Sequence, residues 1–137
     1  MERTLTIIKP DGVAASLTGA ILARLEQAGF RILALRRLHL TRAQAEGFYA
    51  VHRERGFFPD LIRFMTEGPV VAVALEREQA VVELRRLMGA TDPAKAEAGT
   101  VRKQYAASIE RNVIHGSDAP ETARQEIAFF FAQADLL

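Results

Sequence analysis

A histidine close to a predicted helix start is the residue of this sequence best suited to covalent chemistry. His115 lies in residues 111–118, RNVIHGSD. Asp118 and Glu121 are three residues apart with Pro120 between them, a spacing like that of a capping box at a helix start. Free backbone N–H groups at such a start attract anions. Histidine can carry a phosphate there, since one nitrogen of the neutral ring attacks while the other is held. The pattern indicates phosphate chemistry, with an ordinary loop histidine as the alternative.

Further short motifs accompany this segment in order along the chain. They are IKPDGV at 8–13, FY at 48–49, FFP at 57–59, GPV at 68–70, GATDP at 89–93 and GTVR at 99–102. Together with the pattern Asn112-x-x-His115-Gly116-Ser117-Asp118, they resemble the nucleoside diphosphate kinase family. A single short fragment arises easily by chance, whereas these motifs cover nearly the whole chain. The resemblance is therefore specific.

The resemblance implies an enzyme that moves the terminal phosphate of a nucleoside triphosphate, such as ATP, to a nucleoside diphosphate. It implies a ping-pong mechanism in which His115 carries the phosphate, and Mg²⁺ as the cofactor. We expect the nucleotide phosphates and water to hold the metal, because the sequence has no carboxylate cluster with ligand spacing. Asp118 is the nearest acidic candidate for a water-mediated contact with the metal.

Phosphoryl transfer needs a nucleophile, cations over the phosphate oxygens and a site shaped for in-line approach. The resemblance assigns the transferred phosphate to Lys9 and Tyr49, the other phosphate contacts to Arg85, Thr91 and Arg102, and the sugar 3′-hydroxyl to Asn112. Lys9 belongs to a KPDG turn, which would deliver a cation to the end of the first strand. Arg102 follows Gly99-Thr100 in a long loop, where an arginine has little structural purpose.

Two neighbouring arginines compete for one of these roles. Arg85 and Arg86 diverge by about 100° on a helix, so one of them is expected to be a plain surface cation. Counting back from Gly89, the family pattern falls on Arg85. The local sequence leaves Arg86 open as the alternative.

The resemblance also implies how the histidine ring is held and how the base is bound. A glutamate accepts a hydrogen bond from the ring nitrogen that does not attack, and a serine bridges to it; these roles fall on Glu126 and Ser117. Such a carboxylate fixes the tautomer and stabilises developing imidazolium character. Phe57 resembles the residue that stacks on the base, with Leu61 near it. Because stacking serves every base, we expect little base selectivity.

Length and composition fit a single domain over residues 1–137. The formal net charge of +1 gives no global basic field of the kind that binds nucleic acid. The chain has no cysteine, which excludes disulfides and cysteine nucleophiles. It has no signal-peptide layout and no apolar run near 20 residues, so we expect a cytoplasmic protein that does not enter a membrane.

The periodicity of apolar residues predicts alternating strands and helices. The expected strands are residues 4–9, 31–40 and 70–75, with a weak strand at 106–113. The expected helices are 17–28, a short one opened by a Thr41-Gln44 capping box, 59–65, 80–88 and a last one carrying Ala123, Ile127 and Phe130. A long loop near 90–105 shows neither period and is expected to be functional. The order predicts a ferredoxin-like βαββαβ sandwich, an α+β fold whose four-stranded antiparallel sheet has helices on one face.

Two other classes of protein share this topology, so the fold alone does not choose a function. A nucleic-acid-binding module would need exposed aromatic residues on its central strands, and strands 4–9 and 70–75 contain none. A nucleotide-binding regulatory module without turnover remains the second rival. His39 and His52 lie outside every motif, and we expect them at the surface. The resemblance also implies a homo-oligomer, leaving hexamer and tetramer open.

Overall fold

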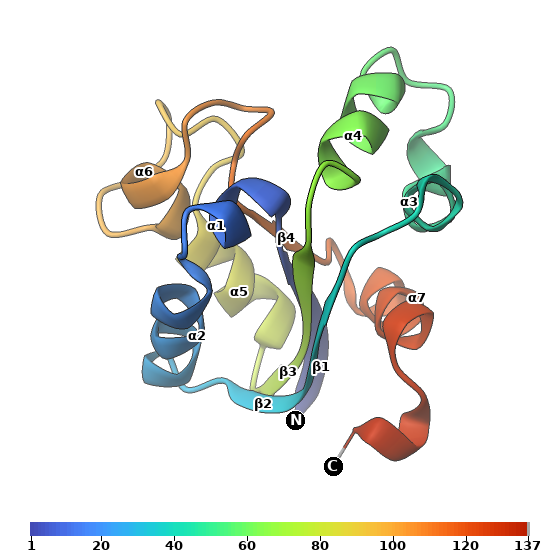
Figure 1. Cartoon of the computed structure of the whole chain (residues 1–137). Coiled ribbons are helices and arrows are strands. Elements are labelled where there is room, and N and C mark those ends of the chain that lie inside the picture. The colour runs from blue at the N-terminus through green and yellow to red at the C-terminus, as the bar shows by residue number, and fades with distance from the viewer. Residues whose placement is uncertain (137) are drawn as a thin grey trace.

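The architecture is a four-stranded antiparallel sheet between two groups of helices (Figure 1). The computed structural model describes residues 1–136. The sheet has the order β2-β3-β1-β4, and its central strands pair from Glu2 opposite Arg77 to Ile8 opposite Val71. The strands are β1 (Glu2–Ile8), β2 (Arg31–Leu38), β3 (Val70–Arg77) and β4 (Ile114–Gly116). The predicted antiparallel α+β fold is confirmed.

Helices of very different length connect these strands and cover the sheet on opposite sides (Figure 1). On one side lie α1 (Pro10–Ala14), α2 (Thr18–Gln27), α5 (Ala80–Met88) and α6 (Val101–Tyr105). On the other side lie α3 (Arg42–Phe48), α4 (Phe58–Met65) and α7 (Pro120–Phe130). Short 3-10 helices cover Ala50–His52 and Gln133–Asp135. The predicted capping box of α3, Thr41 with Gln44, is present.

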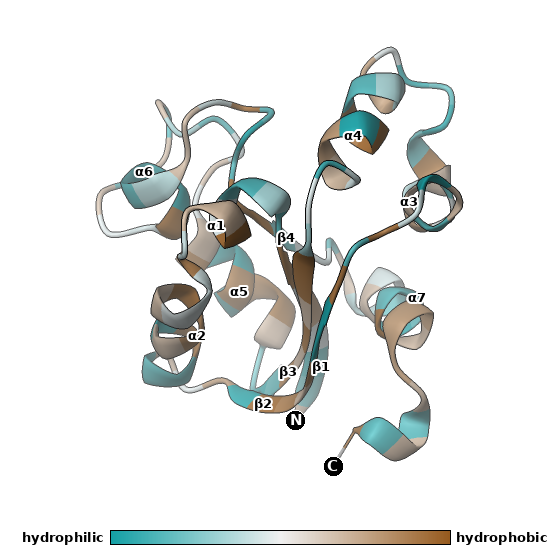
Figure 2. Ribbon diagram, viewed as in Figure 1, coloured by the Kyte–Doolittle hydropathy of each residue, from teal (hydrophilic) through white to brown (hydrophobic). Residues whose placement is uncertain are grey.

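The sheet carries helices on both faces and not on one face as predicted. The reason lies in its central strands, which are apolar on both sides. Ile7 packs in one buried cluster with Ile127 of α7, whereas its neighbour Ile8 packs in a second cluster with Leu84 of α5. All residues from 70 to 75 are buried in β3. Figure 2 shows these hydrophobic residues along the middle of the sheet, between the two groups of helices. Each apolar face of the sheet must therefore be buried by its own layer of helices.

The fourth strand is shorter and later than predicted. Residues 106–113 are irregular, and pairing with β1 begins only at Ile114, opposite Ile8. Val113, just before the strand, has a φ of +74°, which no extended strand accommodates. The histidine therefore lies inside β4 and not in a loop after a strand.

The start of α7 and the long loop also differ from the prediction. Ala119 occupies the N-cap of α7, and its backbone N–H donates to Oγ1 of Thr122 over 3.0 Å. Asp118 is consequently not the cap. The loop predicted at 90–105 contains helix α6, which begins after Thr100, a residue whose hydroxyl accepts a hydrogen bond from the N–H of Lys103.

None of the helices in residues 1–136 combines the length and the apolar character needed to cross a bilayer.

Candidate active site

The site is organised around the two ring nitrogens of His115. This residue lies in β4, opposite Ile7 of β1. Its Nε2 is 2.9 Å from Oε1 of Glu126, and the hydroxyl of Ser117 donates to the same oxygen over 2.8 Å. A carboxylate accepts only, so Nε2 carries the proton and Nδ1 carries the lone pair. Among residues 1–136, Nδ1 has no hydrogen-bond partner. The structure thus brings the three predicted residues together and leaves Nδ1 available for attack.

The Glu126 carboxylate is ionised although it is half-buried on α7. Burial by itself raises the pKa of this carboxyl, but the hydrogen bond and charge of His115 and the hydrogen bond of Ser117 outweigh it and hold the pKa below the usual value. Phe48 packs edge-on against the imidazole, with ring centroids 5.4 Å apart. The ring is therefore fixed both by a charged acceptor and by packing.

Lys9 supplies a buried cation at the end of β1. Its side chain is 8% exposed, and its Nζ donates to Oδ1 of Asn112 over 2.8 Å. Burial, together with the nearby Arg102 and against the attraction of Asp11, lowers the pKa of Lys9 to about 8. Lys9 and Asn112 were predicted to contact different parts of the nucleotide, and in the structure they contact each other.

Arg102 is a second buried cation, presented by α6. Its guanidinium donates to the carbonyl oxygens of Gly89 at 3.1 Å, Ile114 at 2.7 Å and Asn112 at 3.4 Å. Burial, and then the charge of Arg85, lowers the pKa of Arg102 to about 10. The side chain is 5% exposed. These bonds tie the long loop to the segment that carries the histidine, so Arg102 has a structural purpose as well as a charge.

Tyr49 lies beside the histidine with its hydroxyl buried. The two rings are 6.1 Å apart and nearly perpendicular. The hydroxyl has no hydrogen-bond partner among the described residues. Burial, and secondarily the negative charge of Glu126, raises the pKa of this phenol. It therefore stays protonated and is a donor that is free to bind an anion.

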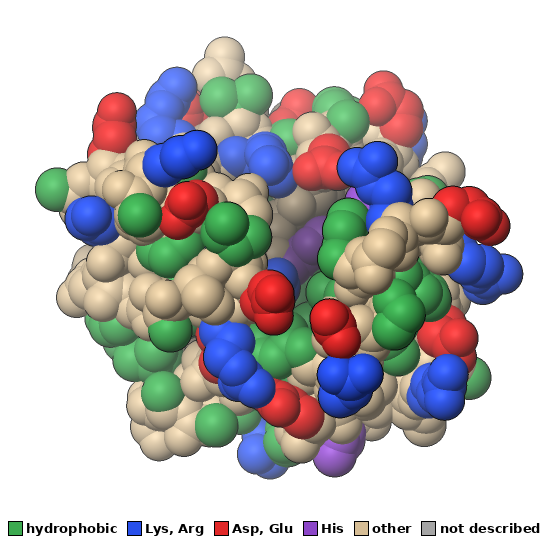
Figure 3. Space-filling model, turned by 90° about the horizontal axis from the view of Figure 1, so that it is seen from above, with side chains coloured by type: hydrophobic (Ala, Val, Ile, Leu, Met, Phe, Trp, Pro, Cys, Tyr) green, Lys and Arg blue, Asp and Glu red, His purple; other side chains and the backbone are tan. Residues whose placement is uncertain are grey.

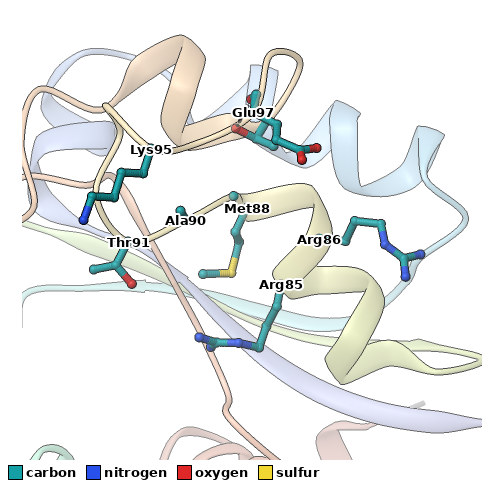
Figure 4. A pocket seen from close by; sticks show the side chains of 9 residues that line it. Arg85, Arg86, Met88, Ala90, Thr91, Lys95 and Glu97 are labelled. Carbon is teal, nitrogen blue, oxygen red and sulfur yellow. Dashed lines mark hydrogen bonds between the residues drawn. The ribbon is translucent and has the colours of Figure 1, made fainter.

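The structure decides between the two neighbouring arginines of α5. Arg85 donates to the carbonyl of Gly116 over 3.3 Å and to Asp118 over 3.1 Å, next to the histidine segment. Arg86 instead pairs with Glu83 of its own helix. Figure 4 shows Arg85 and Thr91 pointing to the same side of a surface depression, and Arg86 pointing to the opposite side. The structure therefore favours Arg85.

An open cleft runs from Lys9 to α4 and gives the site its entrance. It has a volume of about 630 Å³ and is lined by four of the predicted nucleotide contacts: Lys9, Phe57, Leu61 and Thr91. Phe57 is 49% exposed, and the guanidinium of Arg55 lies over its ring, 5.8 Å from the centroid. Figure 3 shows the surface hollowed here, with Lys and Arg side chains at its rim and a histidine inside.

Sequence reasoning overlooked several residues of this site. Ile109 and Arg111 line the cleft, and Arg111 pairs at 2.9 Å with Glu67, which also lines the cleft and lies in the turn after α4. His52, which was expected at the surface, is partly exposed, and its ring lies 5.5 Å from that of Phe57. Asp11 accepts a hydrogen bond from Val113 over 3.1 Å. Asp11 belongs to the KPDG motif, and this position could have marked it as a residue that contacts the site and does not only form a turn.

The carboxylates of the site do not form a metal cage. Within residues 1–136, no three His, Cys, Asp or Glu side chains gather as metal ligands would. Asp118, the acidic candidate, has 76% of its side chain exposed and pairs with Arg85 at 3.1 Å.

A histidine with one nitrogen held and the other free, beside buried cations and a cleft, defines the class: an α+β phosphotransferase. The family model for nucleoside diphosphate kinase matches residues 2–136. The chain belongs to the nucleoside diphosphate kinase family, whose members transfer phosphate between nucleotides.

Individual relatives agree with this assignment. The nucleoside diphosphate kinase of Sorangium cellulosum is 60% identical over 132 residues, which are 96% of this chain and 92% of the relative. That of Geotalea uraniireducens is 56% identical over the full length of both chains. The Aquifex aeolicus enzyme has a solved structure with a TM-score of 0.97, 43% identity and 99% coverage of both chains. The Halobacterium salinarum enzyme, solved in complex with CDP, has a TM-score of 0.95 and 39% identity, and the match covers 99% of this chain and 91% of that one.

Proposed function

We propose that residues 1–137 form one nucleoside diphosphate kinase domain that works by a ping-pong mechanism through phospho-His115. The proposal rests on the different contacts of the two imidazole nitrogens: Nε2 is hydrogen-bonded to Glu126, and Nδ1 is free. A nucleophile oriented by a third group in this way has the arrangement that covalent catalysis requires.

In the first half-reaction, the Nδ1 lone pair attacks the terminal phosphorus of a nucleoside triphosphate. The N–P bond forms, and the bond to the bridging oxygen breaks, so that the nucleoside diphosphate leaves with that electron pair. The ring becomes cationic during attack, and the Glu126 carboxylate stabilises it. In the second half-reaction, a terminal oxygen of another nucleoside diphosphate attacks the phosphorus and the N–P bond breaks.

The surrounding donors stabilise the charge of the phosphoryl group. Lys9 and the neutral Tyr49 hydroxyl contact the transferred phosphate, and Arg85, Thr91 and Arg102 contact the remaining phosphates. Asn112 contacts the sugar 3′-hydroxyl. Such preorganised donors act where charge develops and accelerate transfer. The burial of Lys9 and of Arg102 supports these roles, because a buried cation without a carboxylate partner is costly unless an anion compensates it.

A Mg²⁺ ion would be carried by the nucleotide as part of the substrate, and it would supply further positive charge to the phosphate oxygens. The chain contributes the cations and the histidine, and Asp118 is placed beside Arg85 for a water-mediated contact with the metal.

The base lies in the open cleft, stacked on Phe57 and beside Leu61. The exposure of Phe57 supports this placement. The Halobacterium salinarum relative was solved in complex with CDP, which supports nucleotide binding by this chain. Stacking gives each base a similar free energy, so base selectivity is weak.

The chain also assembles with copies of itself, as a hexamer or a tetramer. Its edge strand β2 exposes Leu35 at 53%, and an apolar residue on an open sheet edge favours association. Light scattering of the purified protein distinguishes the two assemblies from a monomer.

One labelling experiment tests the central claim. The wild type, incubated with γ-labelled ATP and Mg²⁺, should gain one phosphate that survives base and is lost in acid. His115→Ala should gain none while binding nucleotide within about tenfold of wild type, because the histidine contributes chemistry more than affinity. His39→Ala, far from the histidine segment in sequence and bonded to the carbonyl of Thr66, is the matched control and should label normally. A regulatory module without turnover would leave the wild type unlabelled.

A further inference from the structure

A strained turn directly precedes the strand that carries the histidine. Val113 has a φ of +74°, and the N–H of Ile114 donates to the carbonyl of Asn112 over 2.8 Å. A hydrogen bond between residues two apart around a positive φ is a γ-turn of the rare, strained form. Valine is β-branched, and such residues avoid positive φ. This conformation persists only if its surroundings impose it.

The turn is held by hydrogen bonds on all sides. The N–H of Lys9 donates to the carbonyl of Val113 over 2.8 Å, and Arg102 bonds the carbonyls of the two flanking residues. The remaining backbone donor, the N–H of Val113, bonds Oδ2 of Asp11 over 3.1 Å. Asp11 is the only carboxylate among residues 1–136 that bonds this turn. Its removal would leave that N–H without an acceptor.

Asp11 is suited to hold the turn because one of its carboxylate oxygens accepts from it while the other is buried. It lies in α1, and its Oδ1 is buried without a partner among the described residues. Burial, against several backbone hydrogen bonds and the charge of Lys9, raises the pKa of this carboxyl. The next residue is Gly12, where an added Cβ would lie 3.1 Å from Cγ1 of Val113. The absence of that Cβ lets α1 approach the turn closely.

We propose that Asp11 is a positioning residue for phosphoryl transfer, acting through the strained γ-turn at Val113. The turn links two functional side chains, since Asn112 is its first residue and His115 directly follows its last residue, Ile114. Asn112 bonds Lys9, and His115 bonds Glu126. A relaxed turn would shift both side chains, and small displacements of reacting groups cost rate steeply. This inference rests on the proposed function, because it assumes that His115 is the nucleophile.

Four substitutions separate positioning from general stability. Asp11→Ala removes the acceptor, whereas Asp11→Asn keeps one oxygen that can accept from Val113. Val113→Gly removes the strain, because glycine adopts positive φ freely. Val113→Ala also removes the two Cγ methyl groups, and so leaves a similar cavity, but it keeps the strain. It is therefore the matched control for the loss of packing. Each Val113 change is made alone and together with Asp11→Ala.

The measurement is the single-turnover phosphorylation rate with γ-labelled ATP, on protein shown to be folded by circular dichroism. Asp11→Ala should lower the rate about 10- to 100-fold, as loss of other orienting groups does, and Asp11→Asn should recover most of it. Asp11→Ala with Val113→Gly should react at least about fivefold faster than Asp11→Ala with Val113→Ala. Glycine at 113 adopts the positive φ without strain, so the turn no longer depends on the hydrogen bond to Asp11.

Two results would overturn the inference: a folded Asp11→Ala protein that reacts at the wild-type rate, or a glycine at 113 that restores no more rate than alanine. Failure of the proposed function is distinguishable, since the wild type itself would then remain unlabelled.

Discussion

The two ring nitrogens of His115 have different surroundings, which suits the proposed role of this residue as the nucleophile. A free imidazole exchanges its proton between both nitrogens, but the Glu126 carboxylate accepts a bond from Nε2 and keeps the lone pair on Nδ1. Ser117, which is fully buried, donates to the same carboxylate oxygen and to no other acid. The proposed nucleophile is thus part of a hydrogen-bonded unit of three residues, His115, Glu126 and Ser117.

Removing the carboxylate charge at Glu126 tests this unit. Glu126→Gln should lower the phosphorylation rate of the free enzyme about 10- to 100-fold while nucleotide affinity changes little, because the residue orients the ring and does not touch the nucleotide. Stopped-flow quenching with labelled ATP gives the rate, and equilibrium dialysis gives the affinity. Glu121→Gln, on the first turn of the same helix, is the control. An unchanged rate would show that Glu126 does not govern His115.

Lys9 makes the reaction sensitive to alkaline pH. Its pKa of about 8 means that the ammonium of the free enzyme is lost as pH rises through that value, and with it the attraction for phosphate. kcat/KM should therefore fall above about pH 8, and the corresponding limb of kcat should lie at higher pH because bound phosphate favours the ammonium. A pH titration of both parameters checks this. A flat kcat/KM from pH 7 to pH 10 would contradict it.

At the scale of elements, α4 presents the proposed base platform at its first turn. Phe57 is its N-cap, and Leu61 follows one turn later on the same helix face. In the proposed arrangement the base contacts α4, a helix inserted between β2 and β3, and not the sheet.

Stacking on Phe57 predicts a broad substrate range. ADP, GDP, CDP and UDP should have specificity constants within about two orders of magnitude of one another, because stacking free energies differ little between bases. Phe57→Ala should raise KM for all four by a similar factor, corresponding to about 1–3 kcal/mol of lost stacking. Steady-state assays with each acceptor give these values. A preference of about a thousandfold for one base would instead require a hydrogen bond to a base edge.

The end of α5 depends on a glycine that other residues cannot replace. Gly89 has φ +89° and ψ 176°, and an added Cβ would lie 2.5 Å from Oγ1 of Thr100. Gly89→Ala should destabilise the fold by at least about 1–3 kcal/mol and displace the loop that carries Thr91. Gly19→Ala, where a Cβ meets nothing within 4 Å in α2, should instead be neutral or stabilising by about 0.5–1 kcal/mol. Urea unfolding of both variants makes the comparison, and equal effects would contradict it.

For the whole molecule, the buried cations proposed to bind phosphate lower the stability of the folded state. Lys9 and Arg102 are held in place without a carboxylate bonded to either, and both have lowered pKa values. The folded state therefore disfavours their charges, which is the cost of a site prepared for phosphate.

The pH dependence of unfolding reveals this cost. A lysine with a folded pKa of about 8 binds fewer protons between pH 8 and 10 in the folded state than in the unfolded state, so its contribution to stability rises with pH over that range. The wild type should gain stability relative to Lys9→Met between pH 8 and pH 10. The lost bond to Asn112 is the same at every pH and does not affect this trend. Thermal unfolding at several pH values measures it, and a constant difference would refute the buried charge.

Much of the architecture is predictable from local sequence. The alternation of apolar residues gives the first three strands, and the Thr41-Gln44 pair gives the start of α3 to the residue. Such signals act within a few residues, where backbone geometry and hydrogen bonding are local. The motif around His115 identified the family for the same reason, because its residue types stand in one short segment.

Long-range contacts were not predictable in this way. The second helical layer follows from which apolar faces meet, and the choice of Arg85 over Arg86 follows from a contact with Asp118 that is 33 residues away. The bond from Asp11 to Val113 spans 102 residues, and the strain at Val113 exists only because distant groups impose it. The sequence by itself determined the family and the first three strands, and it marked His115 as the candidate nucleophile. Tertiary structure alone decided which nitrogen is free and what holds the turn, because hydrogen bonds and burial depend on groups that meet only after folding.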